Sequence, residues 1–187
     1  MQLETEHLIV RDYEMTDKVA YYRLKSDGET MHYLQDIKLS SMEEADKELA
    51  NILRDRNCSQ RKFYFFHVEI KDTFQQVGSI GYTVMQHTPV GKIVNAGYFM
   101  YPSFWNKGYT TEAFQTLLEF AFEQDNVYRV TTGCLADNKG SERVMQKCGL
   151  VKEAEHIDWE WHEGRMKTRL EYRMLRQEWQ IIKKRNL

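Results

Sequence analysis

The spacing of hydrophobic and polar positions predicts helices in the first part of the chain. A short apolar strand at 8–10 is followed by helical patterns at 19–24 and 29–34. Ser40 and Ser41 each stand three residues before a glutamate, which is the spacing of a capping box and predicts a longer helix after them. The apolar positions of that helix share one face: Met42, Ala45, Leu49, Ile52 and Leu53.

From residue 63 onward the pattern changes to strands. Runs rich in aromatic and β-branched residues at 63–70, 77–87 and 93–101 are separated by polar turns. They predict a three-strand antiparallel meander. A fourth run of this kind, at 129–135, predicts a further strand.

Helical spacing returns in three places in the second half of the chain. After Thr110 a core-facing stripe is predicted at Phe114, Leu117, Leu118 and Ala121. Asn138 is typical of a helix N-cap, and Gly149 is typical of a helix end, so a short helix is expected between them. Trp179 and Ile182 repeat at helical spacing near the C-terminus.

A final hairpin is predicted around the two-residue turn Glu163-Gly164, where glycine favours a tight connection. The register that follows from this turn places opposite charges together on one face and apolar residues together on the other. The expected pairs are Glu160 with Lys167, Asp158 with Arg169, Ile157 with Leu170, and Trp161 with Met166.

The same hairpin carries side chains that could be given another role. Four residues of metal-ligating type would share one face at period two: His156, Asp158, Glu160 and His162. Because cross-strand pairing with Lys167 and Arg169 accounts for the carboxylates, we expect no metal here. Trp159 and Trp161 are predicted to belong to the core, with a place in the acceptor pocket as the alternative.

Together these elements predict a single α+β domain over residues 1–187. Its mixed central sheet would have about seven strands and would be flanked by helices. The order is a strand, two or three helices, a three-strand meander, a helix, a strand, a helix and the final hairpin.

The stretch from Gly97 to Ala113 is the first candidate for chemistry. An apolar strand stops at Pro102, a short loop contains Asn106 and Gly108, and a helix follows. A tight loop that opens a helix presents unpaired backbone N–H groups beside the positive end of the helix dipole. Such a site binds anions, and phosphate is the usual ligand.

Composition narrows the range of functions. The chain has 42% hydrophobic and 29% charged residues and a formal net charge of −2, so neither nucleic acid nor an anionic membrane is an expected partner. We find no apolar run near the ~20 residues of a membrane span, and no signal-peptide pattern. The cysteines are odd in number and lack metal-site spacing, so reduced thiols and a cytoplasmic location are expected: Cys58, Cys134 and Cys148.

The chain resembles the GNAT superfamily of acetyl-CoA-dependent N-acetyltransferases, and within it the RimJ/RimL-type branch. The resemblance spans nearly the whole chain, and its two central motifs together are fairly specific. The segments that carry it are His7–Arg11 with Asp17 and Met31–Leu34, Asn95–Tyr98 with Pro102 and Trp105–Ala113, Asp137-Asn138 with Ser141, Arg143, Val144, Lys147 and Gly149-Leu150, and Leu175–Trp179.

The resemblance implies a coenzyme A site. The pyrophosphate would lie on the backbone amides from Lys107 to Thr111, and the pantetheine arm would follow the strand at Phe99 and Met100, where strands separate. Asn138 would contact the same arm. The cofactor-binding residues implied are Phe99, Met100, Trp105, Asn106, Lys107, Gly108, Tyr109, Thr110, Thr111 and Asn138.

Three residues are implied near the reacting thioester. Ser141 would lie close to the sulfur as a proton donor to the leaving thiolate, and Tyr98 would belong to the active site. Asn95 occupies the position at which many relatives have glutamate as a general base, and an amide cannot take up a proton. Asn106 also replaces a frequent glycine, although Asn tolerates positive φ well.

Without a strong base, an amine of low pKa is favoured as the acceptor. A free α-amine titrates near ~7.8 and a lysine amine near ~10.4, so at pH 7 roughly one α-amine in ten is neutral against about one lysine in a few thousand. The peptide N-terminus is therefore the favoured acceptor. A base acting through water is the alternative, and the candidates are His67, Glu155, His156 and Glu160.

Two other functions stay open at this point. A small-molecule N-acetyltransferase acting on a polyamine or an antibiotic would share the chemistry and differ only in its pocket. A coenzyme A-binding module with weak or lost catalysis would also account for Asn95. The sequence does not identify the acceptor amine. Because exposed sheet edges often pair, a homodimer is one of the assemblies it leaves open.

Overall fold

The computed structural model describes residues 1–185. Within this range eight strands form one sheet: β1 (Gln2–Glu4), β2 (Leu8–Asp12), β3 (Phe63–Ile70), β4 (Gln76–Thr88), β5 (Gly91–Met100), β6 (Val127–Leu135), β7 (Val151–His162) and β8 (Arg165–Leu175). The α-helices of the described residues are α1 (Lys18–Ser26), α2 (Met42–Arg56), α3 (Tyr109–Glu123), α4 (Lys139–Lys147) and α5 (Arg176–Arg185). The α+β class and the mixed sheet are confirmed.

The sheet has one strand more than the sequence predicted. The additional strand is β1, which pairs with β2 through Leu3 opposite Val10. It has only three residues, two of them polar and exposed, so it carries no apolar alternation. Its position is decided by backbone pairing with the neighbouring strand rather than by a local pattern.

The strand order is β1-β2-β3-β4-β5-β6-β8-β7. Neighbouring strands are antiparallel except β5 and β6, which are parallel. The parallel connection is made by α3, as expected for strands that cannot be joined by a tight turn. The one parallel pair therefore divides the sheet into two antiparallel parts, β1 to β5 and β6 to β7. The meander 63–70, 77–87, 93–101 predicted from sequence forms β3, β4 and β5 of the first part.

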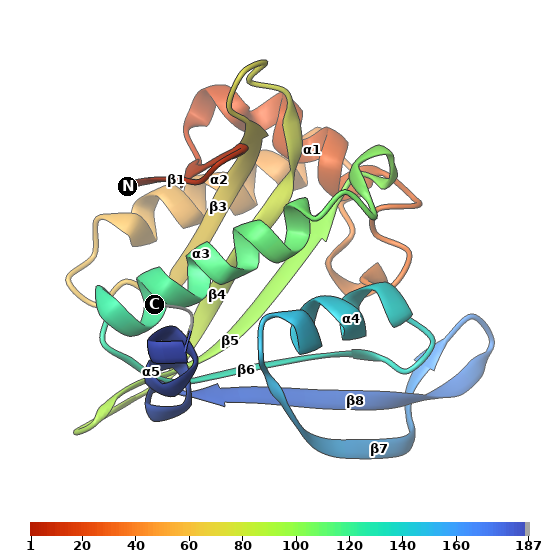
Figure 1. Cartoon of the computed structure of the whole chain (residues 1–187). Coiled ribbons are helices and arrows are strands. Elements are labelled where there is room, and N and C mark those ends of the chain that lie inside the picture. The colour runs from red at the N-terminus through yellow and green to blue at the C-terminus, as the bar shows by residue number, and fades with distance from the viewer. Residues whose placement is uncertain (186–187) are drawn as a thin grey trace.

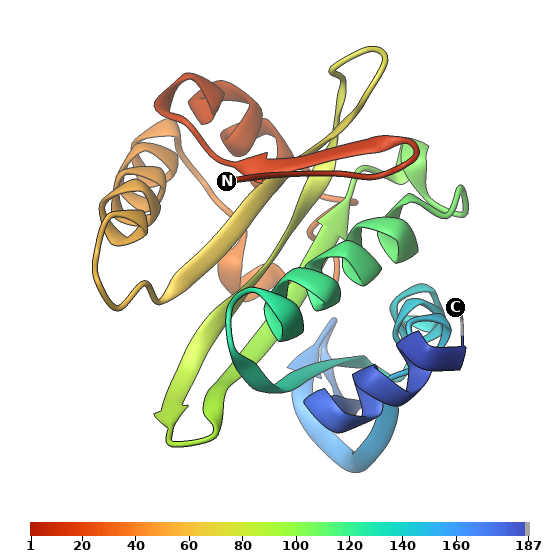
Figure 2. The same cartoon turned by 60° about the vertical axis from the view of Figure 1, so that its left-hand side comes forward.

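The helices cover both faces of the sheet. Figures 1 and 2 show α1 and α2 on one face and α3 and α4 on the other, with α5 beside α3. The main core lies beneath α3, whose buried side chains are those of the predicted stripe together with their neighbours: Ala113, Phe114, Leu117, Leu118, Phe120, Ala121 and Phe122. Trp179 of α5 stacks on Phe122 with 5.9 Å between ring centres.

A second, smaller core lies between the sheet and the first two helices. It contains Tyr13, Tyr21, Leu39, Ala45, Leu49 and Ile52. The N-terminus of α2 is the one predicted: the Ser41 side chain accepts a hydrogen bond from the Glu44 amide at 3.2 Å, and Glu44 accepts one from the Ser40 amide at 2.7 Å. These two hydrogen bonds fix where α2 begins.

The predicted helix at 29–34 is wrong. The segment forms turns, followed by a 3-10 helix at Gln35–Ile37. The Gln35 side chain donates to the carbonyls of Met31 and His32, and Asp27 accepts from the Thr30 amide at 2.7 Å. The Gln35 side chain thus bonds carbonyls that a continued helix would use, which favours turns. We refer to residues 28–37 as the turn segment.

The final hairpin has the predicted turn but only part of the predicted register. Glu163 and Gly164 have φ values of 50° and 77°, as a primed turn requires. Glu160 lies opposite Lys167 and Trp161 opposite Met166, as expected. The other two pairs are wrong, because His156 lies opposite Arg169 and Glu155 opposite Leu170.

A bulge causes the change of register. Residues 157–159 of β7 lie across from Thr168 alone, and Asp158 in the bulge has a φ of 49°. The extra residues separate His156 and Asp158 from Glu160 and His162 on the strand. In the part of the chain that the structure describes, no group of three or more such side chains could hold a metal ion.

The two tryptophans of β7 are not in the core, contrary to expectation. Trp159 is 62% exposed and Trp161 is 69% exposed. The reason is topological: β7 is the edge strand of the sheet, so no strand covers it on its outer side. None of the described helices is long and apolar enough to cross a membrane.

Candidate active site

A cleft of about 990 Å³ lies where β5 and β6 separate. Its lining includes residues of α1, the turn segment and α2, as well as residues at the N-termini of α3 and α4. Since these two groups of elements lie on opposite faces of the sheet (Figures 1 and 2), the cleft passes through the sheet. Its volume suits an extended ligand, and it offers access from two sides.

The separation of the strands begins at a defined point. The parallel pairing of β5 with β6 runs from Lys92 to Asn95, and beyond it β5 pairs only with β4. Thr131 Oγ1 donates to the Val94 carbonyl at 3.0 Å just before the strands part. One edge of residues 96–100 is therefore left without a strand partner and faces the cleft. Backbone groups on such an edge require a hydrogen-bonding ligand or water.

The N-terminus of α3 forms one wall of the cleft. Gly108 has a φ of 90° and Asn106 a φ of 59°, the left-handed conformation expected of this asparagine. The Glu112 amide donates to the Gly108 carbonyl, but within residues 1–185 the amides of 109–111 find no acceptor. Unpaired amides at the positive end of a helix dipole bind anions.

The side chains of this loop have different positions. Trp105 lines the cleft and donates from Nε1 to the Met100 carbonyl at 2.8 Å, which fastens the loop to the end of β5. Asn106, Gly108, Thr110 and Thr111 also line the cleft. Lys107 lies over the Phe104 ring instead, 5.3 Å from its centre. Tyr109 packs against the main core.

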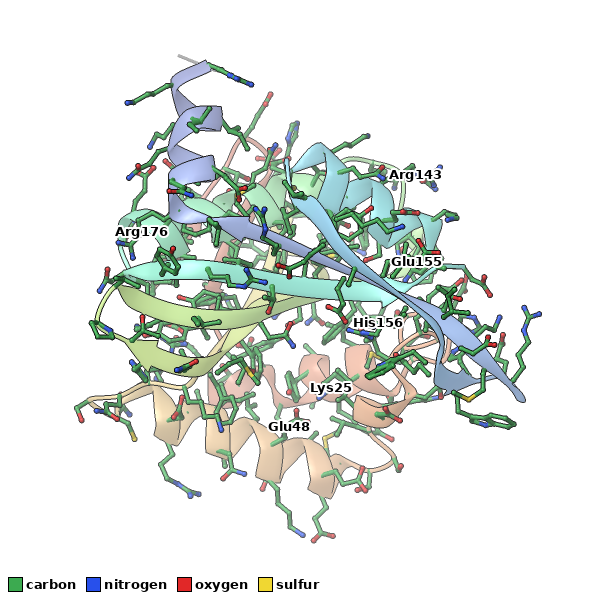
Figure 3. All side chains as sticks on the ribbon, turned by 90° about the horizontal axis from the view of Figure 1, so that it is seen from below. Lys25, Glu48, Arg143, Glu155, His156 and Arg176 are labelled. Atoms are coloured by element: carbon green, nitrogen blue, oxygen red, sulfur yellow. The ribbon has the colours of Figure 1, made fainter. Side chains whose placement is uncertain are left out.

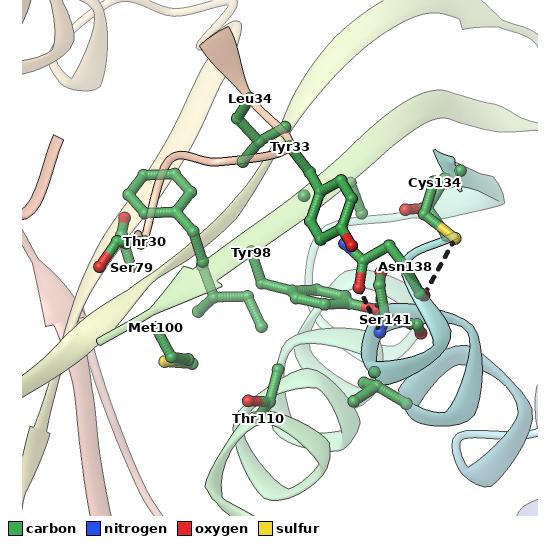
Figure 4. Close-up of a pocket in the computed structure, with 18 of the residues that line it drawn as sticks. Thr30, Tyr33, Leu34, Ser79, Tyr98, Met100, Thr110, Cys134, Asn138 and Ser141 are labelled. Atoms are coloured by element: carbon green, nitrogen blue, oxygen red, sulfur yellow. Dashed lines mark hydrogen bonds between the residues drawn. The ribbon is translucent and has the colours of Figure 1, made fainter. Parts of the chain in front are cut away.

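The short helix α4 begins at the predicted cap. Asn138 Oδ1 accepts a hydrogen bond from the Ser141 amide at 3.0 Å (Figure 4). This contact uses one end of the side-chain amide, and Asn138 also lines the cleft. Three basic residues of α4 line the cleft as well: Lys139, Arg143 and Lys147.

Tyr98 and Ser141 come together across the cleft, although 43 residues separate them in the chain. The Tyr98 hydroxyl lies 3.0 Å from Ser141 Oγ and 3.1 Å from the Ser141 carbonyl (Figure 4). Burial raises the pKa of Tyr98, which the hydrogen bond with Ser141 lowers only in part. The phenol is therefore neutral at physiological pH and keeps a proton that it can donate.

Asn95 lies on the other face of β5. It is exposed and lines the cleft, opposite Thr83 of β4. Side chains alternate along a strand, so Asn95 and Gly97 face α1 and α2, whereas Tyr98 faces α3 and α4. The side-chain amide of Asn95 thus lies in the part of the cleft that α1, the turn segment and α2 line. We call this part the α1–α2 half.

The four residues predicted as possible bases acting through water lie in different places relative to the cleft. Glu160 lines the cleft and pairs with Arg169 at 2.9 Å. His67 is a buried residue of β3, 3.0 Å from Glu69, and burial lowers its pKa. Glu155 pairs with Lys152 on the surface, and His156 lies beside Trp159. Of the four, Glu160 alone is among the described residues that line the cleft.

The chain is similar to known proteins in sequence and in fold. The acetyltransferase (GNAT) domain model matches residues 7–151. YnaD of Bacillus subtilis (strain 168), named as an uncharacterized N-acetyltransferase, is 30% identical over 155 residues, which cover 82% of this chain and 84% of that protein. The chain belongs to the GNAT acetyltransferase family. It is an N-acetyltransferase of a family that uses acetyl-CoA.

Two solved structures show the same fold as this GNAT protein. The ribosomal-protein-S5-alanine acetyltransferase of Vibrio fischeri has a TM-score of 0.83 at 19% identity, with 96% of this chain and 98% of that chain covered. The spermidine N-acetyltransferase of Vibrio cholerae, in complex with CoA and spermine, has a TM-score of 0.82 at 16% identity, with 94% and 99% covered. At these identities the likeness concerns the fold.

The candidate site also contains residues that the sequence did not indicate. They line the α1–α2 half of the cleft and include Tyr21, Lys25, Glu48, Tyr33 and Phe65. Lys25 falls at a buried position of α1, which a helical pattern would reserve for an apolar residue. This departure is the one local indication of a site. The others become neighbours only through packing of α1 and α2 on the sheet.

The cysteines of this GNAT protein are expected to differ sharply in reactivity. Cys58 is exposed, whereas Cys134 and Cys148 are buried, and burial raises their pKa values to about 11 and about 12. Because the thiolate is the nucleophile, Ellman's reagent at pH 8 should modify one thiol rapidly and the other two only after unfolding. Rapid modification of the Cys58→Ser variant would contradict this assignment and would support a reactive thiol in the cleft.

Proposed function

We propose that this GNAT enzyme is a RimJ/RimL-type acetyltransferase that transfers acetyl from acetyl-CoA to the α-amine of a peptide or protein N-terminus. The observation that carries the proposal is the continuity of the cleft. One cavity joins the free amides of α3, the open edge of β5 and the Tyr98–Ser141 pair. It also continues to the opposite face of the sheet, where an amine can enter.

The lining of the cleft fits coenzyme A. The amides of residues 109–111 suit a pyrophosphate, and the open edge of β5 at Phe99 and Met100 suits the amide groups of the pantetheine arm. Asn138, which keeps one end of its amide free, lies beside the same path. The basic side chains of α4 supply positive charge for a further phosphate.

The chain supplies hydrogen-bond donors where charge develops during transfer. Acetyl-CoA supplies the thioester that the amine attacks, and the products are an amide and the coenzyme A thiol. Backbone N–H groups on the 98–100 edge of β5 can stabilise negative charge on the carbonyl oxygen. The Tyr98 and Ser141 hydroxyls can pass a proton to the departing sulfur.

The acceptor is inferred from proton transfer. Asn95 cannot remove a proton, and Glu160 is engaged by Arg169. An α-amine, with a pKa near ~7.8, needs less help than a lysine amine. A peptide N-terminus is therefore the acceptor class that the site suits best.

The charges in the α1–α2 half favour this acceptor over a polyamine. Two of its three carboxylates are already paired with cations that line the same cleft, Glu48 with Lys25 at 2.5 Å and Glu160 with Arg169 at 2.9 Å. The third, Glu29, is at the exposed rim. A polyamine carries several positive charges and would meet two fixed cations in this half.

Calorimetry and a coupled assay test the proposal. Purified protein should bind acetyl-CoA, and Arg143→Gln and Lys147→Gln should each weaken binding several-fold, in line with the loss of one charged hydrogen bond. Release of coenzyme A should be faster with N-terminal peptides than with spermidine or with N-acetylated peptides that keep a lysine. Absence of acetyl-CoA binding would contradict the proposal, and faster acetylation of spermidine would replace the proposed acceptor.

A further inference from the structure

We propose that Lys25 and Glu48 form a recognition site for an α-amino-acyl group, that is, an ammonium one carbon away from a carbonyl or carboxylate. Glu48 would accept from the ammonium, and Lys25 would donate to the carbonyl or carboxylate oxygen. The inference rests on the proposed function and specifies the chemistry that the acceptor presents. It concerns binding of the acceptor only.

Lys25 is the unusual member of the pair. It is 3% exposed and yet lines the cleft. Its ammonium lies 2.5 Å from Glu48 Oε1 and 5.4 Å from the centre of the Tyr21 ring. An ammonium has three N–H donors, and among residues 1–185 Glu48 is the single hydrogen-bond acceptor that contacts it. Two donors of a desolvated cation therefore remain for a ligand.

Glu48 supplies the complementary function. Its side chain is 35% exposed and faces the same cleft from α2 (Figure 3). Lys25 donates to Oε1, and burial, together with this carboxylate close to the Tyr21 hydroxyl, raises the pKa of that phenol. A carboxylate oxygen held beside a fixed cation is oriented without motion when an ammonium arrives. Donors and acceptor thus lie side by side, as an α-amino-acyl group requires.

The surroundings of the pair are mostly apolar. Tyr21 and Phe65 line this half of the cleft, together with Tyr33, Leu34 and Ile37 of the turn segment. His162 Nε2 donates to the His32 carbonyl at 2.7 Å, which ties the turn segment to the hairpin. Low polarity strengthens hydrogen bonds to charged groups, and apolar walls can accommodate a first side chain.

A purely structural role does not explain the position of the pair. Helices α1 and α2 are already linked by Lys18 and Asp46 at 2.9 Å, on the surface. Withdrawing the Lys25 ammonium from water is costly, and attraction to one partly exposed carboxylate offsets that cost only in part. Unlike the surface pair, Lys25 and Glu48 both line the cleft, and Lys25 keeps N–H donors that can contact a ligand there.

Two sources could supply the group: a peptide N-terminus presents a carbonyl, and a free amino acid presents a carboxylate. Binding to the protein, measured by calorimetry with alaninamide, trialanine amide, alanine and isopropylamine, distinguishes them. Isopropylamine matches alaninamide without the carbonyl. Wild-type protein should bind alaninamide at least ~10-fold more tightly than isopropylamine, the value of a hydrogen bond to a charged group. Tighter binding of trialanine amide than of alanine would assign a peptide.

Variants localise the effect. Lys25→Met should remove the preference for alaninamide over isopropylamine, and Glu48→Gln should weaken both about 10-fold. The matched control is the exposed pair Glu43 and Lys47 on the same helix, 2.6 Å apart, where Glu43→Gln and Lys47→Met should change neither. If Lys25→Met does not fold, Lys25→Arg keeps the charge, and displacement of its donors should still reduce the preference.

Acetyl-CoA binding, measured in parallel, separates the two proposals. If wild-type protein binds no acetyl-CoA, the proposed function fails, whatever the amine data show. If it binds acetyl-CoA but alaninamide and isopropylamine equally, or if both variants bind alaninamide as the wild type does, the recognition site is wrong and the proposed function stands.

Discussion

Tyr98→Phe should lower kcat about 10²-fold, the usual contribution of a positioned proton donor. The substitution removes the hydroxyl that lies 3.0 Å from Ser141 Oγ and leaves the ring, which packs on Phe114 with 5.1 Å between centres. Affinity for acetyl-CoA should stay within about threefold of the wild-type value, because its contacts are proposed for the α3 amides and β5. Steady-state kinetics with a peptide acceptor give both quantities.

The pH profile adds a second readout. Burial raises the pKa of Tyr98 above the ordinary value of ~10. The phenol should therefore stay protonated, and kcat should show no fall attributable to it up to pH ~10, while the rising limb follows the acceptor amine. Tyr172→Phe is the control, since that hydroxyl contacts Glu142 and Gln146 away from the cleft lining. Equal loss in both variants, or a wild-type rate in Tyr98→Phe, would exclude the role.

Gly97→Leu should block the acceptor half of the cleft and leave the fold intact. A Cβ added at Gly97 would meet no atom within 4 Å, and the residue is exposed and lines the cleft. The larger side chain would occupy the space beside Asn95 through which an amine must pass. We expect kcat/KM for the peptide to fall about 10²-fold, since displacement of about 1 Å at a reacting group has this effect. The melting temperature should change by less than ~3 °C.

The directly opposed glycine gives the matched control. Gly81 pairs with Gly97 across β4 and β5, but a Cβ added there would lie 2.2 Å from the Tyr64 carbonyl and 2.7 Å from Phe65. Gly81→Ala should therefore lower the free energy of unfolding by about 2 kcal/mol, as overpacking does. Thermal and urea unfolding compare the two variants. Strong destabilisation by Gly97→Leu would contradict an open cleft at this position.

Much of the fold was predictable from local pattern. The meander, α2 with its Ser41 cap, and the stripe of α3 are each specified by residues within one element. The predictions were wrong where residues outside an element decide its conformation or its burial. Bonds from the Gln35 side chain to the Met31 and His32 carbonyls favour turns over the expected helix at 29–34, and the edge position of β7 left Trp159 and Trp161 exposed.

The candidate site divides in the same way. Its cofactor half lies on contiguous segments, in which loop glycine and asparagine positions and a helix start are visible in sequence. Its acceptor half is assembled from α1, the turn segment, α2 and the hairpin, which are far apart in the chain. Lys25 and Glu48 are 23 residues apart on different helices, and nothing in either segment indicates that they meet.

By itself the sequence determined the strand, loop and helix from Gly97 to Ala113, because φ preference, capping and dipole act within a few residues. The tertiary structure decided which side chains and strands face this loop and helix start. Parting of β5 and β6 after Asn95 opened the sheet, and packing brought Tyr98 to Ser141 and Lys25 to Glu48. Such contacts depend on register and on helix docking, which no local pattern records.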